Sequence, residues 1–566
     1  MERLSLAERA RIAALSADRS RRFALSRVLS SPLLKWRHSS RAPDQLLIVP
    51  QDLRTTDASF WQEVRHGQFG LAGSIADTGE HSPFDIVPPT PAWERALHGF
   101  GWLRHLAAAD DPEARQVARQ LALEWIERSQ TPGAPGWEAA TVARRLVAWL
   151  SHAPLLLEST DQRSYDTILD SFGFQLAMLS ATWRTAPPGY PRLLCLVALT
   201  LADLCLSGHD RDLKGVERLL AGELQRQILG DGGHVSRNAA VLVEIQLDLL
   251  PLRQCFNARN RPVPEPVDAA VGRILPILRY LRMGDGMLAR FNGVGVATPV
   301  GLATVLAYGD VAGEGLKAAP ESRYFRMERG ETIIVIDGGP PPPLHVAGDA
   351  HAGCLSFEMS IGTRLLLVNG GAPSGADADW RPASRATASH NTLCLAESSS
   401  SRLIRHRVLE ELVGAAPIRQ PDAVSAELRE DEGGGLAFDG RHDGYLQRHG
   451  YLHARRLALD ASGTRFEGED RLEPADGKVG RKLPFAIHFH LHPDVGCRRV
   501  LSAADTVEIE PGGGAVWRFT CAGARLSVEE SVHYADSAGP RRSLQIVLRG
   551  TAAGETLVTW MLSKVV

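Results

Sequence analysis

The chain has 566 residues, 44% of them hydrophobic and 23% charged, which is an ordinary globular composition and a length that suggests two or more domains. A formal net charge of −3 gives no support for a nucleic-acid or anionic-membrane surface, although a local basic patch could still meet an acidic ligand. The seven cysteines show no C-x-x-C spacing, which argues against a zinc ribbon or a dithiol redox motif.

The N-terminal stretch, MERLSLAERARIAALSADRSRRFALS, mixes charged and apolar residues and lacks the uninterrupted apolar core of a signal peptide. No window of about 18 apolar residues occurs anywhere, so no transmembrane helix is expected. An odd, dispersed set of cysteines fits free thiols in a reducing compartment. We therefore expect a cytoplasmic location by default, with the periplasm left open, and expect residues 1–90 to wrap the domain that follows.

From about residue 92 to residue 285 apolar residues recur at positions i, i+3, i+4 and i+7, as in PEARQVARQLALEWIERS and TVARRLVAWLSHAPLLLE. The joints between these segments are short and carry Pro, Gly or Asp, which predicts a series of antiparallel neighbouring helices. Residues 192–206 are apolar on more than one face. This pattern predicts an inner ring of helices shielded by an outer ring, rather than a single bundle.

The period changes near Gly284, and from Tyr324 onward apolar and polar residues alternate, as in ETIIVIDGG, FAIHFHLHP and ETLVTWML. Gly, Asp and Asn turns join these strands over hairpin lengths, which predicts stacked antiparallel sheets in a sandwich. The predicted fold class is thus multidomain α+β. We divide the chain into an N-terminal wrapping segment (1–90), a helical domain (91–290), a linker (291–320) and a β-sandwich (321–566).

Several stretches resemble motifs of the heparinase II/III-like polysaccharide lyases. HAGCLSFEMSIGTRLLLVNGGAP and RATASHNTLCL resemble two sandwich motifs, DGGHVSRN resembles a helical-domain motif, and HDGY, HARRLAL and FEGED resemble later sandwich strands. The resemblance covers most of the chain from about residue 90 and indicates a divergent member. It implies an (α/α) toroid of paired antiparallel helices, a large antiparallel β-sandwich, and a substrate groove between the two.

Lyases of this family cleave uronic-acid glycans by β-elimination, which needs a base at C5, an acid for the departing oxygen and neutralisation of the uronate carboxylate. The resemblance therefore implies an acidic polysaccharide or oligosaccharide as partner and a carbon–oxygen lyase activity. Several family positions are altered, so the assignment as an enzyme stays open. A non-catalytic glycan-binding protein and a cytoplasmic interaction protein without a glycan role are the alternatives.

The resemblance also implies a zinc site. His351 and His390 match two metal-ligating histidines of the family, and two imidazoles at the edges of one sandwich can converge on one ion. The third family ligand is an Asp, which is Asn369 here, and a neutral amide oxygen is a poor zinc ligand compared with a carboxylate. Two structural histidines at a domain interface are the alternative.

The family's proton-transfer residues are changed in this chain. Asp349 stands where the family has the first His of His-x-His, and an Asp can serve as a general base. No Tyr follows the Ser-Arg of DGGHVSRN, so His234 and Tyr324 complete the candidate catalytic set. Backbone amides and Arg near a helix start suit an anion, and a capping or packing role is the alternative for each. The candidate substrate-binding residues are Arg237, Asn238, Tyr190 and Arg385.

The stretch AIHFHLHP places three histidines, His488, His490 and His492, on one face of a single predicted strand. Side chains two residues apart lie about 7 Å from each other along a strand, so at most two could share an ion. Packed or solvated histidines are the expected reading of this pattern.

Overall fold

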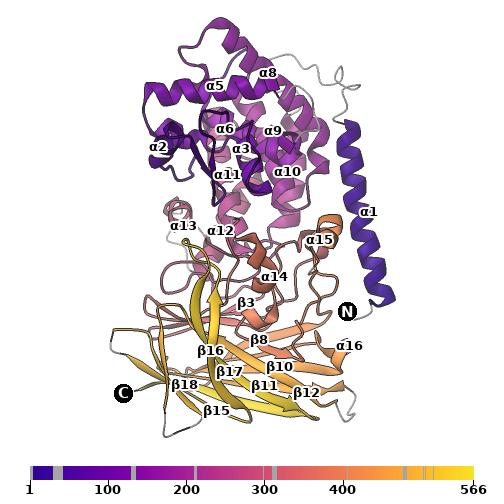
Figure 1. The fold of residues 1–566 in the computed structure, drawn as a ribbon, viewed down its shortest axis with the longest axis vertical. Coiled ribbons are helices and arrows are strands. Elements are labelled where there is room, and N and C mark those ends of the chain that lie inside the picture. Colours follow the sequence, from indigo (N-terminus) through magenta and orange to yellow (C-terminus); the bar gives the residue numbers. More distant parts are fainter. Residues whose placement is uncertain are drawn as a thin grey trace.

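The computed structural model describes residues 4–29, 43–128, 135–208, 213–296, 299–308, 315–375, 377–404, 406–475, 481–500, 503, 505–513 and 515–565. Helices fill the first half of the chain and antiparallel strands fill most of the second (Figure 1). The predicted multidomain α+β fold class is confirmed. In the part of the chain that the structure describes, no helix is both long and apolar enough to span a bilayer.

A long N-terminal helix, α1 (Leu6–Leu29), runs alongside both halves of the molecule (Figure 1). It contacts α8 (Gln162–Thr182) in the helical half and α15 (Arg407–Val413) in the strand half. The sequence did not predict this helix, because its apolar residues recur too irregularly. Further along the N-terminal segment lie α2 (Ser59–Arg65) and a hairpin of β1 (Gln68–Leu71) and β2 (Ser74–Asp77).

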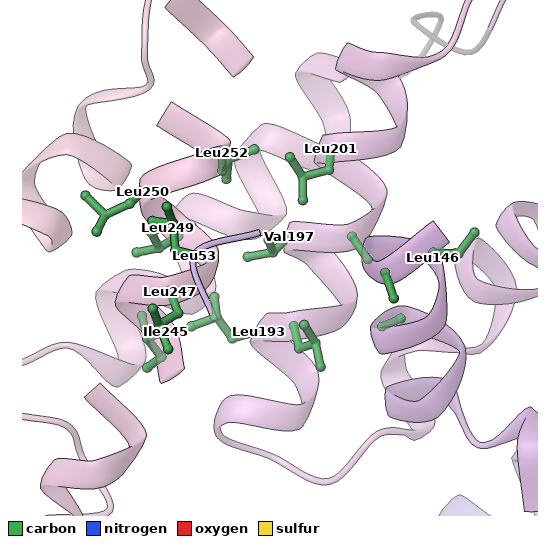
Figure 2. Packing of buried hydrophobic residues seen from close by; sticks show 14 of the residues in the cluster. Leu53, Leu146, Leu193, Val197, Leu201, Ile245, Leu247, Leu249, Leu250 and Leu252 are labelled. Atoms are coloured by element: carbon green, nitrogen blue, oxygen red, sulfur yellow. The ribbon is translucent and has the colours of Figure 1, made fainter. Parts of the chain in front are cut away.

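The helical half is a layered array in which α9 is the most completely buried element. Its residues from Leu193 to Ala202 are all buried, because α6 and α11 pack beside it (Figure 2). Leu53 of the N-terminal segment lies in the same cluster. The helices are α3 (Pro91–Gly99), α4 (Leu103–Ala108), α5 (Pro112–Arg128), α6 (Ala139–Ser151), α7 (Ala153–Leu157), α8, α9 (Tyr190–Cys205), α10 (Leu213–Gln227), α11 (Ala239–Ala258) and α12 (Glu265–Tyr280).

A short helix, α13 (Pro299–Ala307), packs on α11 and α12 within the range predicted to be a linker. It therefore extends the helical half. Its sequence is strongly apolar but too short to show a clear helical period, which is why the sequence did not predict it.

The strand half contains three antiparallel sheets packed around one aromatic-rich core. The large sheet has the order β13-β14-β15-β18-β11-β10-β9-β8, and two four-stranded sheets have the orders β16-β17-β12-β7 and β3-β4-β5-β6. The strands are β3 (Tyr324–Arg329), β4 (Thr332–Asp337), β5 (Phe357–Ile361), β6 (Arg364–Leu367), β7 (Leu393–Leu395), β8 (Val424–Glu430), β9 (Leu436–His442), β10 (Tyr451–Leu459), β11 (Arg465–Pro474), β12 (Leu483–His490), β13 (Gly496–Arg499), β14 (Thr506–Glu510), β15 (Val516–Ala522), β16 (Arg525–His533), β17 (Arg541–Ala552) and β18 (Thr556–Val565).

Short helices and loops of the strand half face the helical half (Figure 1). The 3₁₀ turn η5 (Leu344–Val346) reaches α9, since a Cβ on Gly189 would lie 3.3 Å from Val346. The other short elements are η6 (Ala378–Trp380), α14 (Arg381–Ser384), η7 (Thr387–Ser389), α15 and α16 (Leu446–His449). The candidate site lies among these loops.

Candidate functional site at the domain junction

The DGGHVSRN segment joins the two halves of the molecule. The Oδ2 atom of Asp231 accepts hydrogen bonds from the backbone nitrogens of Glu321 and Ser322, at 2.9 and 2.7 Å, and from the Ser322 hydroxyl at 2.9 Å. Gly232 has a φ of +87°, and a Cβ there would lie 1.9 Å from the carbonyl oxygen of Arg273. The Asp-Gly pair of the motif therefore forms a joint between the helices and the first sandwich strand.

Arg237, from the same DGGHVSRN segment, and Tyr324, the first residue of β3, contact each other in a buried polar network. The Arg237 guanidinium lies 2.7 Å from the Asp337 carboxylate and over the Tyr324 ring at 4.5 Å. The Tyr324 hydroxyl donates to the Arg237 carbonyl oxygen at 2.6 Å and accepts from the Asn292 amide at 3.0 Å. Burial raises the pKa of Tyr324, and the nearby Asp337 carboxylate raises it further. The phenol proton is therefore strongly held in a buried network.

His351 and His390 lie next to each other, as the resemblance implied. The His351 Nδ1 and His390 Nε2 atoms are 3.0 Å apart, and the His390 Nδ1 atom is 2.8 Å from the Ala386 carbonyl oxygen. Because a carbonyl can only accept, His390 carries its proton on Nδ1, and His351 donates to His390 Nε2. Burial lowers the pKa of His390 to about 4 and lowers the pKa of His351 as well. The two rings form a neutral hydrogen-bonded pair.

Asn369 is fully buried beside this pair and has one unpaired group. Its Oδ1 atom accepts from the Asn391 backbone nitrogen at 3.0 Å, and no described residue accepts a hydrogen bond from its Nδ2 atom. An Asp would present a second oxygen where Nδ2 lies. A Cβ on Gly353 would lie 2.7 Å from His390 Cδ2, so there is little room for a side chain at position 353.

These residues do not fit a zinc ion. The two imidazoles satisfy each other, the Asn369 oxygen is already engaged, and an amide nitrogen is not a zinc ligand. Within the described ranges, no three His, Cys, Asp or Glu side chains gather as a set that could hold a metal ion.

Asp349 and Asn238 both lie against Gly293. A Cβ on Gly293 would lie 2.8 Å from the Asp349 Cβ and 3.0 Å from the Asn238 Nδ2 atom. The Asp349 side chain is 66% exposed and pairs with Arg381 at 3.0 Å. Asn238 caps α11 by accepting from the Ala240 nitrogen at 3.0 Å. Asp349 is therefore the most accessible of the candidate catalytic residues.

His234 and Arg385 are both engaged in the structure. The His234 ring nitrogens lie 2.6 Å from the Ser236 hydroxyl and 3.0 Å from the Gln227 side-chain oxygen, and burial lowers its pKa to about 3. Arg385 is buried and donates to two backbone carbonyl oxygens, those of Ala350 and Ala415, at 2.9 and 2.8 Å. Burial lowers the pKa of Arg385 to about 10. Neither side chain is free for a ligand in this conformation.

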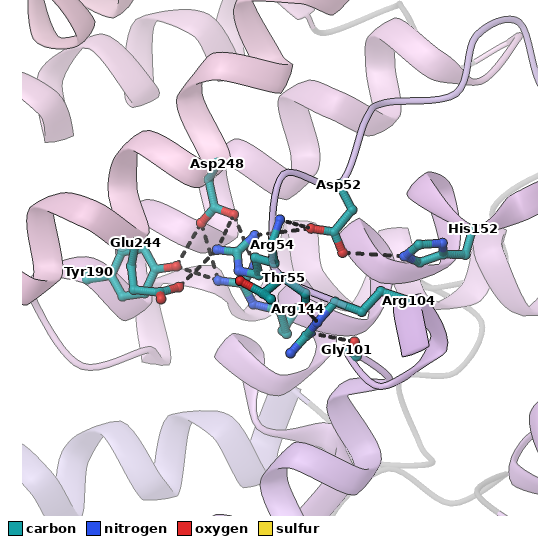
Figure 3. A network of polar contacts seen from close by, with 10 residues as sticks. All are labelled: Asp52, Arg54, Thr55, Gly101, Arg104, Arg144, His152, Tyr190, Glu244 and Asp248. Atoms are coloured by element: carbon teal, nitrogen blue, oxygen red, sulfur yellow. Dashed lines mark hydrogen bonds and ion pairs between the residues drawn. The ribbon is translucent and has the colours of Figure 1, made fainter. Parts of the chain in front are cut away.

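Tyr190 belongs to a separate polar network inside the helical half (Figure 3). Its hydroxyl donates to Asp248 Oδ2 at 2.7 Å, and Arg144 binds the same carboxylate at 3.0 and 3.2 Å. Arg54 of the N-terminal segment lies 2.9 Å from Asp248 and 3.0 Å from Glu244. These contacts direct the Tyr190 hydroxyl into the helical array.

The structure thus brings most of the predicted residues into one junction and leaves His234 and Tyr190 in neighbouring networks. Four residues that hold the junction together were not predicted from the sequence. Asn292 links Tyr324 to Asp337 and lies 3.4 Å from the His351 backbone nitrogen, and Arg381 pairs with Asp349. Asn292 and Asp337 each precede a glycine in the sequence, whereas Glu358 lies within β5 and Arg381 begins α14, so no shared pattern marked the four. The unpredicted residues are Asn292, Asp337, Glu358 and Arg381.

Comparisons with known proteins agree with this architecture. Residues 311–561 match the family model described as "Heparinase II/III-like, C-terminal". FtsZ-localized protein C of Caulobacter vibrioides is 32% identical over 539 residues, which cover 92% of this chain and 91% of that protein. The crystal structure of heparinase III superposes with a TM-score of 0.67 at 13% identity, over 95% of this chain and 89% of that one. The heparan sulfate lyase HepC of Pedobacter heparinus gives 0.55 at 15% identity, over 98% and 88%. At these identities the two solved structures establish the fold alone.

Proposed function

Because the chain belongs to the heparinase II/III-like family, we propose that it is a binding protein on a polysaccharide-lyase scaffold that does not catalyse β-elimination and works where FtsZ assembles. The observation that carries the proposal is the state of the candidate proton-transfer groups. Both ring nitrogens of the buried His234 are hydrogen-bonded, and the Tyr324 hydroxyl is held between Arg237 and Asn292. An elimination needs such groups free to exchange protons with the substrate.

Arg237, the cationic side chain that could neutralise a uronate carboxylate, is also already paired. Arg237 is tied to Asp337 at 2.7 Å and donates to the Ser322 carbonyl oxygen at 2.9 Å, so its charge is balanced before any uronate arrives. Neutralising the uronate carboxylate is a requirement of the reaction. The scaffold is retained while the groups for the chemistry are used to hold the two halves together.

The relative from Caulobacter vibrioides supports the cellular side of the proposal, since its name describes a protein localised with FtsZ. The proposal keeps the expected cytoplasmic location. A fluorescent fusion of this chain, expressed in the bacterium that encodes it, should form a band that coincides with FtsZ and disperses when FtsZ is depleted. A uniform distribution that ignores FtsZ would contradict this part of the proposal.

A glycan ligand is favoured by an exposed aromatic ring beside Asp349. Trp380 is 44% exposed and lies against Tyr534, with ring centroids 5.8 Å apart, and the next residue is Arg381. Indole faces stack on the apolar faces of sugar rings, and the acidic character of the proposed ligand comes from the family resemblance, since Arg381 already pairs with Asp349 and Glu410. We therefore propose an acidic polysaccharide or oligosaccharide as the ligand at this edge of the junction. Trp380→Ala should weaken its binding, while Tyr308→Ala, which removes an exposed ring elsewhere, should not.

Lyase activity is the second candidate, favoured by the exposed carboxylate of Asp349 between the two halves. The test is to incubate the protein with heparin, heparan sulfate and alginate and to follow the ultraviolet absorbance of the unsaturated uronate. We expect no increase with or without added zinc. An increase that disappears in Asp349→Asn would replace the binding proposal by a lyase with Asp349 as its base.

A further inference from the structure

Three basic side chains that the candidate site does not use lie on segments that pack together near Gly371. They are Arg290 in the loop after α12, His492 just after β12, and His533 at the end of β16. The His492 and His533 ring centroids are 5.7 Å apart. A Cβ on Gly371 would lie 3.3 Å from Arg290 Cδ and 2.4 Å from the Cβ of Ala535, so the Arg290 side chain runs beside the residues that follow His533.

The Arg290 guanidinium acts electrostatically on both rings. Burial lowers the pKa of His533 to about 3, and the charge of Arg290 is the next cause. The pKa of His492 is lowered by burial and then by the same guanidinium. Both imidazoles are therefore neutral near a fixed positive charge, and they can offer N–H donors without adding a second charge.

Two nitrogen atoms of this cluster have no hydrogen-bond partner within the described ranges. Among the residues that the structure describes, no acceptor lies within hydrogen-bond distance of the buried Arg290 Nη1 or of the buried Nδ1 atom of His533. Arg290 is 9% exposed and His533 is 3% exposed. Leaving a buried donor unsatisfied is unfavourable, especially when it belongs to a charged group.

The nearest carboxylate, that of Glu358, does not accept a hydrogen bond from Arg290 Nη1. Glu358 Oε2 is 3.8 Å from Arg290 Nη1, which is too long for a hydrogen bond. Its two oxygens accept from the backbone nitrogens of Asn369 at 2.8 Å and Arg290 at 3.0 Å. Glu358 is therefore used to fix the loop, and the guanidinium points past it.

The surface carboxylates near His492 and His533 also have other hydrogen-bond or ion-pair partners. Asp494 and Asp536 both bind Arg541, at 2.9 and 3.2 Å, and Asp494 approaches His492 only to 3.6 Å. The third acid near the cluster, Asp285, is exposed and accepts from the Met287 backbone nitrogen at 2.9 Å. His492 Nδ1 already accepts from the Asp494 backbone nitrogen at 3.3 Å, so among the described residues the atoms of this cluster without a partner are Arg290 Nη1 and His533 Nδ1.

We propose that Arg290, His492 and His533 form a binding site for a small oxyanion, in which the anion accepts hydrogen bonds from Arg290 Nη1 and from the His533 ring in the tautomer that carries its proton on Nδ1. Sulfate, phosphate and carboxylate share this chemistry, since each offers several acceptor oxygens and a charge that complements the guanidinium. The site is separate from the His351–His390 pair and does not depend on the proposed function.

The experiment measures anion binding by the full-length protein. Thermal unfolding and titration calorimetry are carried out at constant ionic strength with chloride replaced stepwise by sulfate, phosphate or acetate. We expect a saturable increase in Tm and a matching binding heat for at least one oxyanion. The order of the three affinities identifies whether a tetrahedral or a planar anion is preferred.

Variants then locate the binding. Arg290→Gln and His533→Phe should each raise the Kd tenfold or more, and Arg290→Lys, which keeps the charge, should raise it less than Arg290→Gln. Arg518→Gln removes an exposed arginine on β15 and should change the Kd less than twofold. Absence of saturable binding in the wild type, or equal affinity in wild type and His533→Phe, would overturn the proposal. A selenate-soaked crystal with its anomalous peak elsewhere would do the same.

Discussion

At the residue scale, the main finding is that polar side chains retained at the junction now act as structural links. The sequence predicted that His351 and His390 could converge, because a motif resemblance fixes which residues correspond, and the two rings do lie together. It could not predict that the two rings bond to each other, because this depends on the Ala386 carbonyl oxygen that sets the tautomer of His390.

Introducing a second side-chain oxygen at position 369 tests whether the amide of Asn369 is what prevents zinc binding here. Asn369→Asp should let the side chain keep its contact with the Asn391 nitrogen and turn a second oxygen toward the histidine pair. We expect about one zinc per chain by elemental analysis in Asn369→Asp and a much smaller amount in the wild type. The double variant Asn369→Asp with His351→Ala should lose the metal. Equal zinc in wild type and Asn369→Asp would show that the amide is not the limiting change.

A second residue-scale prediction concerns the buried charge that supports the same loops. Asp470 binds Arg455 through both oxygens, at 2.8 and 3.0 Å, and Arg455 donates to the carbonyl oxygens of Leu355 and Asn391. Asp470→Asn should leave a buried guanidinium without its counter-ion and lower the free energy of unfolding by about 3–5 kcal/mol. Denaturant unfolding measures this. Asp439→Asn, on the exposed face of β9, should change stability by less than about 0.5 kcal/mol.

At the element scale, the N-terminal segment is fixed to the helical array by charge as well as by Leu53. Asp52 lies 3.3 Å from His152, and Arg54 binds Asp248 (Figure 3). Burial alone would raise the pKa of Asp52, but the His152 hydrogen bond and the Arg54 charge outweigh it and lower the pKa to about 2. The segment predicted only to wrap the helices is therefore inserted among them.

This pKa shift predicts how acid affects the segment. A carboxylate whose pKa is lower in the folded state stabilises the protein above its unfolded pKa, and loses that contribution as the pH falls through the folded value. The lowering of the Asp52 pKa from 3.8 to about 2 corresponds to about 2 kcal/mol at neutral pH. Asp52→Asn should remove this contribution at pH 7 but make little difference near pH 2. A constant difference between the two proteins across this range would contradict the argument.

Elements were predicted well where one period continued over many residues. The helices of the array and the alternating strands after Tyr324 meet this condition. The helices α1 and α13 do not, because α1 has irregular apolar spacing and α13 is short and apolar throughout. At the site, residues in motifs were found, whereas Asn292 and Asp337 were missed because single polar residues in turns carry no pattern.

At the scale of the whole molecule, the two halves are joined through buried polar contacts. Asp231 is central to this joint, because Oδ2 accepts from Glu321 and Ser322 while Oδ1 accepts from the Gly233 nitrogen at 3.0 Å. An amide has only one acceptor atom and would place an N–H₂ group against a backbone N–H.

Asp231→Asn should therefore weaken the coupling between the halves. We expect a loss of about 1–3 kcal/mol and a calorimetric unfolding transition that broadens or divides in two, since each half keeps its own core. The matched control is Asp161→Asn, which keeps a side-chain oxygen for the cap of α8. A single sharp transition in Asp231→Asn at the wild-type temperature would mean that the joint does not depend on this carboxylate.

Helix α1 gives the molecule a second connection between its halves. It contacts α8 above and α15 below, and Glu8 binds Arg402 at 2.7 Å. Because α1 is a continuous helix that contacts both halves, it restrains rotation of one half relative to the other. Any partner that displaced α1 would therefore leave the two halves joined by the junction contacts alone.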